Sequence, residues 1–485
     1  MKILLVLPAT PAYRVVVGGR VARRAMLRFS VLPLTTVAAL TPPEHQVELC
    51  DENVRPLDFA TPADVVAVSF MTAYAPRAYE IAAQFRRRGA VVVAGGYHPS
   101  FCPDEVAEHF DVVVRGDAEG LWPQVLRDIA AGHPRKVYAH SVPPELAGSP
   151  MPRRDLAAPW ARHYATLHAI QVGRGCRHTC RFCSVTAFHR GTYRRKPLER
   201  VLQEMQTAPR HFIFVDDNLI ADPDYARALL TAMVPLRKRW SSQCSLRIAD
   251  HPDLLVLARR AGCVGLFVGL ESISRASLAS VDKGVNTEGD SAARIRAIRQ
   301  AGIAVQAAVI VGLDHDDPTV FRRTLDYLEA VRADALQLSI LTPLPGTPLF
   351  DDFARAGRIL DRDWSHYDFR HTVIRPACMS PEDLQAGAEW LYAQFYRLDR
   401  ILPRVWRTLL AAGPVAALLG LRLNLTYRYD NRREGIRGRD PAVLRPDLGP
   451  GRWAVWSRGL RRLVRPGVRL ESGAPKGPSP TAAGA

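Results

Sequence analysis

The chain has 485 residues, of which 47% are hydrophobic and 23% are charged, which is typical of globular domains and unlike disordered or fibrous proteins. This length exceeds what one hydrophobic core organises, so we expect two domains and an appendage. Eight cysteines in a chain of this length exclude a small disulfide-built module. The opening MKILLVLPATPAYR lacks the apolar length and cleavage site of a signal peptide. We therefore expect a cytoplasmic protein with reduced thiols.

The first 141 residues alternate short valine-rich runs with helix-compatible segments. The predicted strands are KILLVL (2–7), QVELC (46–50), DVVAVSF (64–70), VVVAGG (91–96) and DVVVRGD (111–117). Strands that are hydrophobic throughout and separated by helices are typical of a parallel sheet covered on both faces. We predict a doubly wound, Rossmann-like α/β domain over 1–141, with its ligand crevice in the loops that follow the strands.

A proline-rich linker, 142–165, leads to a second series of strands, each followed by a helical segment. These predicted strands are AIQVGRG (169–175), HFIFVDDN (211–218), CSLRIAD (244–250), VGLFVGLES (264–272), AVQAAVIVGLD (304–314) and ALQLSILTPLPG (335–346). The series predicts a partial (β/α)6 barrel of the TIM type over 166–375. Chemistry in such a barrel takes place at the carboxyl ends of the strands.

Beyond residue 375 the strand pattern stops, and we predict a helical, basic appendage over 376–470. It opens with an amphipathic helix, 380–401, that Ser380 can cap. The apolar run TLLAAGPVAALLGL (408–421) is broken by Pro414 and falls short of the roughly 20 residues that span a bilayer. The Pro/Gly-rich end, 471–485, is predicted to be disordered.

The formal charge of +17 is concentrated late in the chain and has three interpretations. It can be a solubilising arginine-rich surface, or it can attract an anionic membrane or nucleic acid. The run GRWAVWSRGLRRLV (451–464) also allows peripheral membrane contact in one specific form, with Trp453 and Trp456 at headgroup depth. The plainer interpretation is helices that pack on the barrel with arginines facing outward.

The stretch QVGRGCRHTCRFC (171–183) places Cys176, Cys180 and Cys183 within eight residues. Three thiolates so close together can hold one metal centre from a loop. A zinc ion would need a fourth ligand, for which His178 or His189 is available. An iron–sulfur cube held by only three thiolates instead leaves one iron open to an exogenous ligand, because such clusters are ordinarily held by four.

The spacing Cys-x3-Cys-x2-Cys, with Phe182 beside the last cysteine, resembles the radical S-adenosylmethionine (SAM) superfamily. The resemblance implies a [4Fe–4S] cluster whose open iron is chelated by the amino and carboxylate groups of SAM. One electron from the reduced cluster then cleaves SAM to methionine and a 5′-deoxyadenosyl radical. The resemblance also implies an external reductant such as flavodoxin or ferredoxin.

Four later stretches fit the same superfamily in order: VDDN, SLR, VGLES with DKG at 282–284, and VIVGLD. The SAM contacts that they imply are Asp216, Asp217, Arg247, Glu271 and Gly312. Carboxylates can accept hydrogen bonds from the SAM ammonium group and ribose hydroxyls, and an arginine can pair with the SAM carboxylate. Carboxylates at strand ends also commonly cap the next helix, so both interpretations of Asp216 and Asp217 stay open.

A doubly wound domain ahead of such a barrel resembles the cobalamin-binding subfamily, class B. The stretches that carry this resemblance are MKILLVLPAT, DEN (51–53), VVAGGYHPS (92–100) and VVVRGDAEG (112–120). The implied cobalamin contacts are Gly95, Gly96, His98 and Gly116. His98 equally fits a role in capping the following helix. The loop 8–20 contains no histidine, so the resemblance implies a cobalt ion without a histidine ligand from this loop.

These features favour a cobalamin-dependent radical SAM enzyme that methylates an unactivated carbon of a small-molecule or lipid substrate. One alternative uses the same cofactors for ring closure or rearrangement without methyl transfer. A methylthiotransferase is disfavoured, because its leading domain should carry a cysteine trio and this one has only Cys50 and Cys102. A nucleic-acid-binding iron–sulfur protein is also disfavoured, because the basic residues lack interleaved aromatic side chains. The pattern identifies no catalytic residue beyond the cofactor contacts.

Overall fold

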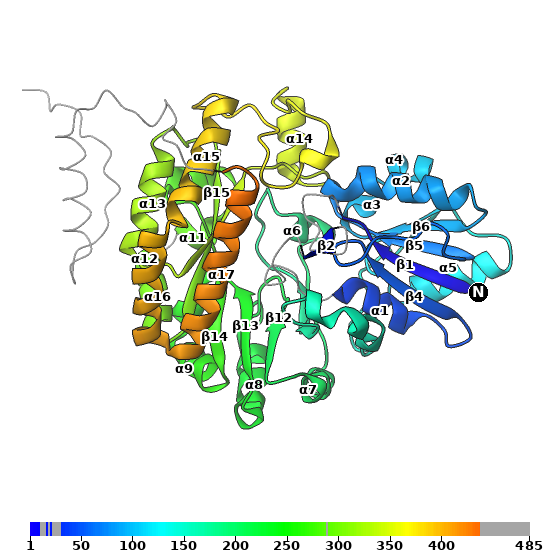
Figure 1. The fold of residues 1–485 in the computed structure, drawn as a ribbon, viewed down its shortest axis with the longest axis horizontal. Coiled ribbons are helices and arrows are strands. Elements are labelled where there is room, and N and C mark those ends of the chain that lie inside the picture. Colours follow the sequence, from blue (N-terminus) through cyan, green and yellow to red (C-terminus); the bar gives the residue numbers. More distant parts are fainter. Residues whose placement is uncertain (10–15, 18–19, 22–30, 288–289, 437–485) are drawn as a thin grey trace, which may run out of the picture.

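The computed structural model describes residues 1–9, 16–17, 20–21, 31–287 and 290–436. Two α/β units lie next to each other, with the helical C-terminal segments packed on the second unit (Figure 1). Some predictions concern residues outside the described part of the chain: Trp453, Trp456, the run 451–464 and the tail 471–485.

The first unit is a parallel six-stranded sheet in the order β4-β1-β5-β6-β7-β8. Its strands are β1 (Lys2–Leu7), β4 (Gln46–Asp51), β5 (Val65–Ser69), β6 (Val91–Gly95), β7 (Val112–Arg115) and β8 (Val137–Ala139). Helices α1 (Leu32–Leu40) and α5 (Leu121–Ala130) cover one face, and α2 (Ala75–Arg86) and α4 (Pro103–His109) cover the other. The doubly wound prediction is thus confirmed, while β8 was not predicted.

The linker between the two sheets is ordered and belongs to the packing of the first unit. It contains a 3-10 helix, η4 (Arg154–His163), and the aromatic ring of Tyr164 packs into the core under α1 and α5. The Tyr164 hydroxyl donates a hydrogen bond to Asp51 Oδ2 at 3.0 Å, which ties the linker to the end of β4.

The second unit is a parallel six-stranded sheet in the order β16-β15-β14-β13-β12-β9, which confirms the partial barrel. Its strands are β9 (Ala169–Ile170), β12 (His211–Phe214), β13 (Arg239–Cys244), β14 (Cys263–Glu271), β15 (Ala304–Val311) and β16 (Ala335–Ile340). Its helices are α7 (Leu198–Thr207), α8 (Pro223–Met233), α9 (Pro252–Arg260), α12 (Ser291–Gln300), α13 (Val320–Ala330) and α14 (Pro348–Arg355). A separate antiparallel ribbon joins β10 (Gly173–Gly175) to β11 (Tyr193–Arg195).

Two strand predictions need correction. The single strand predicted over 169–175 is divided between β9 and β10, which lie in different sheets. The segment 244–250 was expected to be a strand, but β13 ends at Cys244 and the following residues form a 3-10 helix, η6 (Leu246–Asp250). The Ser245 hydroxyl accepts a hydrogen bond from the Arg247 backbone N–H at 3.3 Å, which turns the chain out of the strand direction. A serine cap of this kind competes locally with strand pairing.

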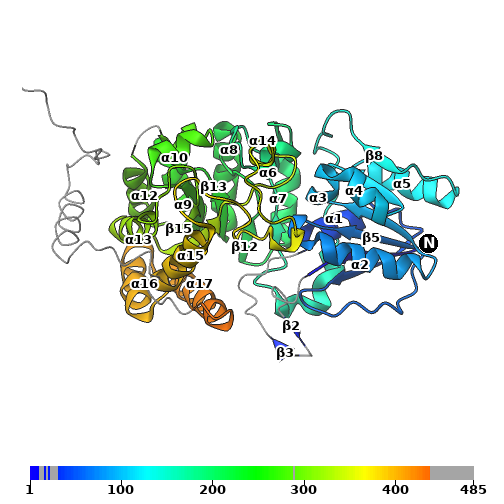
Figure 2. The same cartoon turned by 90° about the horizontal axis from the view of Figure 1, so that it is seen from above.

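The appendage consists of α15 (Pro381–Phe395), α16 (Leu398–Ala412) and α17 (Pro414–Arg433). Ser380 Oγ accepts from the Asp383 backbone N–H at 3.1 Å, which confirms the predicted cap, but the predicted helix 380–401 is interrupted at 396–397. Figure 2 shows α16 and α17 side by side, projecting from the barrel. Within the described part of the chain, every helix is too short or too polar to cross a bilayer.

Candidate active site between the two domains

The cysteine loop, 176–183, runs from β10 to the short helix α6 (Ser184–Phe188). Two carboxylates at the end of β12 hold the strand that leads into it. Asp216 accepts from the backbone N–H of Val172 at 3.0 Å and of Gly173 at 2.6 Å, and Asp217 Oδ2 accepts from Gly175 at 3.0 Å. Burial raises the pKa of Asp216 to about 7 and also raises that of Asp217. Both carboxylates therefore support the loop, while their contact with SAM stays a prediction.

The loop brings the thiols of Cys176, Cys180 and Cys183 together. Burial raises the pKa of Cys176, and it raises that of Cys180 to about 11; in each case the neighbouring cysteines add to the effect. A donor set of three thiols with no fourth in the loop fits a multinuclear iron–sulfur cluster that keeps one iron open.

The zinc alternative loses one of its histidine candidates. Nδ1 of His189 lies 2.9 Å from Arg194 Nη2 and accepts a hydrogen bond from it. Burial lowers the pKa of His189 to about 4, so the ring is neutral and engaged in the protein.

Glu271 ends β14 at a register irregularity between Gly269 and Glu271, and its φ is +63°. The carboxylate is buried, and its Oε1 lies 3.0 Å from the ammonium nitrogen of Lys283. Burial alone would lower the pKa of Lys283. The nearby Glu271 and Cys180 have a larger effect in the opposite direction, so the pKa of this ammonium is raised. Lys283 thus lies between the strand-end carboxylate and the cysteine loop. The sequence analysis quoted it in DKG without assigning it a role.

The backbone next to Glu271 is tightly enclosed. Asn286, in α11 (Gly284–Thr287), donates from Nδ2 to the carbonyls of Gly269 and Leu270 at 2.8 and 3.0 Å. Asn286 Oδ1 is buried and has no hydrogen-bond partner among the described residues. Buried acceptors are ordinarily satisfied, so this oxygen marks a place where a bound ligand can donate.

Gly312 and Arg247 lie at the same carboxyl edge of the barrel. Gly312 follows β15 with a φ of +94°, and its N–H donates to Asp316 Oδ2 at 3.0 Å. The space beside its Cα is filled by Leu384 of α15. Arg247, in η6, lies 3.3 Å from Asp250. Burial lowers the pKa of His178, and the nearby positive charge of Arg247 adds to this effect. The predicted SAM contacts thus share one edge of the barrel with the cysteine loop.

In the first domain, the predicted cobalamin glycines lie in two loops that one serine joins. Gly96, after β6, has a φ of +103°, and a side chain there would approach the carbonyl of Phe70. Ser100 Oγ donates to the Gly96 carbonyl at 2.7 Å and accepts from the Gly116 N–H at 2.9 Å. Gly95 closes β6 and accepts from Phe70. Their contact with cobalamin stays a prediction.

His98 lies in the core of the first domain, where its ring contacts Trp364 of the second unit at 5.4 Å between centroids. Its side chain is fully buried, with Nε2 3.1 Å from the Tyr79 hydroxyl and Nδ1 3.4 Å from Thr72 Oγ1. It belongs to a hydrogen-bonded group in which Glu105 accepts from Tyr79 at 2.7 Å and from Trp364 of the second unit at 2.9 Å. These contacts fit a structural role for His98. The residue lies within the short helix α3 (Tyr97–Phe101) and not at its cap.

The residue before it, Tyr97, faces the cysteine loop instead. Its ring stacks on Phe188 of α6 with the centroids 4.5 Å apart. Burial, together with the nearby Asp217 and Cys183, raises the pKa of the Tyr97 hydroxyl. This residue was missed, although GGYHPS was identified as a ligand loop.

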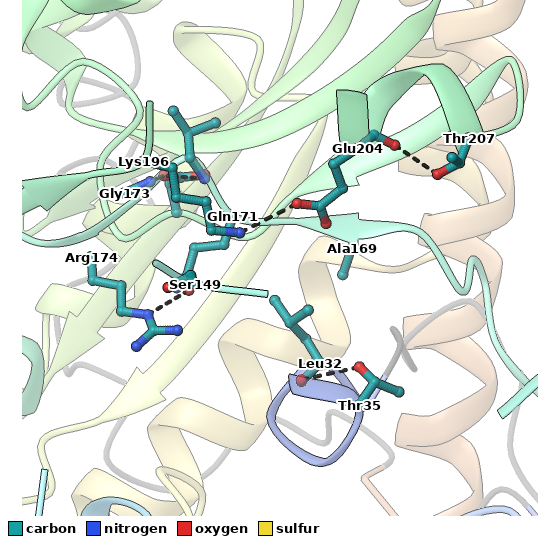
Figure 3. Close-up of polar contacts among 12 residues, drawn as sticks. Leu32, Thr35, Ser149, Ala169, Gln171, Gly173, Arg174, Lys196, Glu204 and Thr207 are labelled. Atoms are coloured by element: carbon teal, nitrogen blue, oxygen red, sulfur yellow. Dashed lines mark hydrogen bonds and ion pairs between the residues drawn. The ribbon is translucent and has the colours of Figure 1, made fainter. Parts of the chain in front are cut away.

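A buried ion-pair network joins the two domains directly beside the cysteine loop. Arg174 of β10 donates to Asp117 Oδ1 at 2.8 Å and to Glu119 Oε1 at 2.7 Å, and Arg194 of β11 lies 2.8 Å from Asp117 Oδ2. Arg174 also donates to Gln171 at 2.9 Å (Figure 3). Asp117 and Glu119 come from the predicted ligand loop VVVRGDAEG. The crevice of the first domain and the cysteine loop are therefore held against each other.

The lumen of the barrel contains a cavity of about 1330 Å³. Its walls are inner faces of β12 to β16, the segment 368–371, and one face each of α15 and α17. Its lining includes Asp216 and Asp217, after β12, and Val415 and Leu418, at the start of α17. The cavity thus runs from the carboxyl ends of the strands to the C-terminal helices.

Comparison with known proteins supplies the deciding observation. A B12 binding domain model matches residues 21–126 and a Radical SAM superfamily model matches 170–328. Bacteriochlorophyllide d C-12(1)-methyltransferase of Chlorobaculum tepidum is 31% identical over 422 residues, which cover 83% of this chain and 89% of the relative. The chain belongs to the cobalamin-binding radical SAM family. The Hopanoid C-2 methylase of Rhodopseudomonas palustris is 28% identical, covering 89% of this radical SAM protein and 83% of the relative.

The fold matches a solved member of the same family. The radical SAM methyltransferase TsrM of Kitasatospora setae, with cobalamin and a [4Fe–4S] cluster bound, superposes with a TM-score of 0.59 at 19% identity, covering 80% of this chain and 81% of TsrM. The predicted family, fold class and cofactor set are confirmed. This radical SAM enzyme uses a [4Fe–4S] cluster, SAM and cobalamin.

Proposed function

We propose that this enzyme transfers a methyl group from SAM to an unactivated carbon of a large, mainly apolar molecule bound in the lumen. The observation that carries the proposal is the cavity of about 1330 Å³ that begins at Asp216 and Asp217. It exceeds the roughly 300–1,000 Å³ of ordinary small-molecule sites. The named substrates of the two curated relatives, a bacteriochlorophyllide and a hopanoid, are molecules of this size and polarity.

Polar groups on the cavity wall can orient such a substrate. Gln306 of β15 donates to the Tyr427 hydroxyl of α17 at 3.1 Å. Arg370 pairs with Glu434, and both residues line the cavity. A few polar groups in an apolar cavity fix the orientation of a ligand. We propose that these groups bind a carboxylate or hydroxyl of the substrate and so orient it.

The proposed cofactor contacts follow from the site geometry. Cys176, Cys180 and Cys183 would hold the cluster, and Asp217, Arg247, Glu271, Lys283 and Gly312 would surround SAM. Gly95, Gly96 and Gly116 would approach cobalamin. When bound, these groups supply one-electron cleavage of SAM and a methyl carrier, with the electron coming from a flavodoxin or ferredoxin.

The chain itself has three tasks in this proposal. The ammonium of Lys283 can pair with the SAM carboxylate while it keeps Glu271 oriented. Asp216 and Asp217 hold the strand that leads into the cysteine loop, through the backbone N–H groups of Gly173 and Gly175. The apolar lumen keeps water away from a reactive radical.

The test uses the full chain, reconstituted anaerobically with iron, sulfide and cobalamin, with reduced flavodoxin as the electron donor and SAM that carries a trideuterated methyl group. A bacteriochlorophyllide and a hopanoid serve as probe substrates. We expect 5′-deoxyadenosine, S-adenosylhomocysteine and a product that carries the deuterated methyl group by mass spectrometry. Cys180→Ala should abolish 5′-deoxyadenosine and the labelled product, whereas Cys378→Ala, which removes an exposed thiol outside the loop, should retain both. Formation of 5′-deoxyadenosine with a product that lacks the label would instead identify ring closure or rearrangement.

A further inference from the structure

Helix α16 exposes large apolar side chains, while its buried side carries two polar side chains among apolar ones. The buried residues are Ile401, Arg404, Thr408 and Ala412. Its outer face carries Leu402, Trp406 and Leu410, whose exposed fractions are 62%, 61% and 71%. A surface helix in water normally buries its apolar stripe and exposes its polar side.

The two buried polar side chains of α16, Arg404 and Thr408, make specific hydrogen bonds. Arg404 donates to Asn424 Oδ1 of α17 at 2.7 Å and to the Phe395 carbonyl at 3.0 Å. Thr408 donates to Asp334 at the start of β16. These buried hydrogen bonds fix which side of the helix faces the barrel. The leucines and the tryptophan are therefore held outward by the fold.

The exposed apolar side continues onto α17 across the turn at Gly413. Val415 and Leu418 are 40% and 59% exposed, and both also line the lumen cavity. We define the apolar hairpin face as the following exposed residues: Leu398, Leu402, Trp406, Leu409, Leu410, Val415 and Leu418. This face is continuous with one end of the substrate cavity.

Several arginines lie on and near the apolar hairpin face, which also carries Asp399, paired with Arg397. Arg422 is exposed on α17, Arg407 lies on α16, and Arg332 is exposed and close enough to Arg407 to act on its charge. The whole chain carries a formal charge of +17. A second copy of the chain on this face would bring like charges together, whereas an anionic surface would be attracted.

We propose that the apolar hairpin face docks into the headgroup region of an anionic lipid bilayer, with α16 lying in the membrane plane. An exposed row of leucines with a tryptophan and flanking arginines matches interfacial helices. Arginine side chains can reach the headgroups while their stems cover apolar surface. Docking would turn one end of the lumen toward the bilayer, so that an apolar substrate can enter without crossing water. The docking surface stands independently of the methyl-transfer proposal.

The experiment is cosedimentation of the full chain with vesicles of phosphatidylcholine alone and of phosphatidylcholine mixed with phosphatidylglycerol. We expect the wild type to partition onto the mixed vesicles. The double variant Leu402→Glu/Leu410→Glu should reduce this partition at least about tenfold, because two buried leucine contacts are lost. The control Val142→Glu/Leu360→Glu adds the same charge at exposed apolar residues elsewhere and should bind like the wild type. Unchanged far-ultraviolet circular dichroism would show that both variants fold.

Three results would overturn the proposal. The wild type could stay in the supernatant with both kinds of vesicle. The hairpin variant could partition like the wild type, which would assign membrane binding to other residues. A dimer seen by analytical ultracentrifugation, and lost in the hairpin variant without any vesicle binding, would assign the face to a second copy of the chain.

Discussion

The pair of Lys283 and Glu271 shows how a single contact can serve the cofactor site. Both side chains are mostly buried, at 13% and 11% exposure, and each charge depends on the other. Removing one partner of a buried ion pair leaves the other uncompensated, which costs about 3–5 kcal/mol. The same ammonium lies near the cysteine loop, so its loss should affect SAM as well as the fold.

We therefore expect Lys283→Met to lower the affinity for SAM by about tenfold or more and to lower the thermal midpoint. Lys283→Arg keeps the charge and should retain most of both. SAM binding to the cluster-loaded enzyme can be measured by equilibrium dialysis, with differential scanning calorimetry for stability. If the methionine variant binds SAM like the wild type, Lys283 has no role toward the cofactor.

The residue scale also shows what a sequence can and cannot predict at this site. The spacing of three cysteines carries its own chemical meaning, so Cys176, Cys180 and Cys183 were identified directly. The choice between Tyr97 and His98 could not be made, because adjacent residues on a helix point about 100° apart. Which of them faces the barrel depends on how α3 (Tyr97–Phe101) is oriented in the fold. Arg174 was missed because its partners, Asp117 and Glu119, lie in the other domain.

At the scale of elements, β14 combines a bulge with two glycines that face the lumen. Gly269 lies beside Glu271, and a Cβ at this position would overlap the Glu271 carboxylate. Gly265, four residues earlier on the same strand, has room, since its Cβ would lie 3.6 Å from the nearest atom, the Ala304 carbonyl oxygen. The bulge and the small residue together let the carboxylate fold back toward Lys283.

Gly269→Ala should therefore push the Glu271 carboxylate away from Lys283 and weaken SAM binding by about tenfold, with little change in the fold. Gly265→Ala is the matched control and should bind SAM like the wild type. Equilibrium dialysis of SAM on both cluster-loaded variants, with circular dichroism for the fold, distinguishes them. Equal SAM affinity in the two variants would contradict the proposed role of the bulge.

The accuracy of the element predictions followed the hydrophobic pattern. The valine-rich strands of the first domain were found because both of their faces are buried. Strand β13 reads RWSSQC and was misplaced, because its lumen-facing side is polar and the neighbouring CSLRIAD is more apolar. Helix α16 was not predicted as an element, because the predicted helix 380–401 and the apolar run 408–421 divide its residues, and the burial of Arg404 and Thr408 became visible only in the fold.

At the scale of the whole molecule, the two domains meet through a buried network of charged groups as well as through aromatic contacts such as Tyr97 with Phe188. Arg174, Arg194, Asp117 and Glu119 form the buried network, and His189 adjoins it with 5% exposure. Such an interface fixes the relative position of two cofactor sites, because each guanidinium can be satisfied in few geometries. It should also make the contact between the domains sensitive to acid.

His189 allows this sensitivity to be tested with a definite sign. Burial lowers its pKa to about 4, with Arg194 and Arg174 adding to the effect and Asp117 opposing it. Between a pH of about 6.5 and about 4 the unfolded chain binds a proton that the folded chain does not, so stability falls as the pH falls. From about pH 7 to about pH 5 the loss is about 2 kcal/mol. In His189→Gln, whose amide oxygen can still accept from Arg194, this part of the loss should disappear. Urea unfolding of both proteins at the two pH values measures the difference, and equal pH slopes would mean that His189 titrates like an exposed histidine.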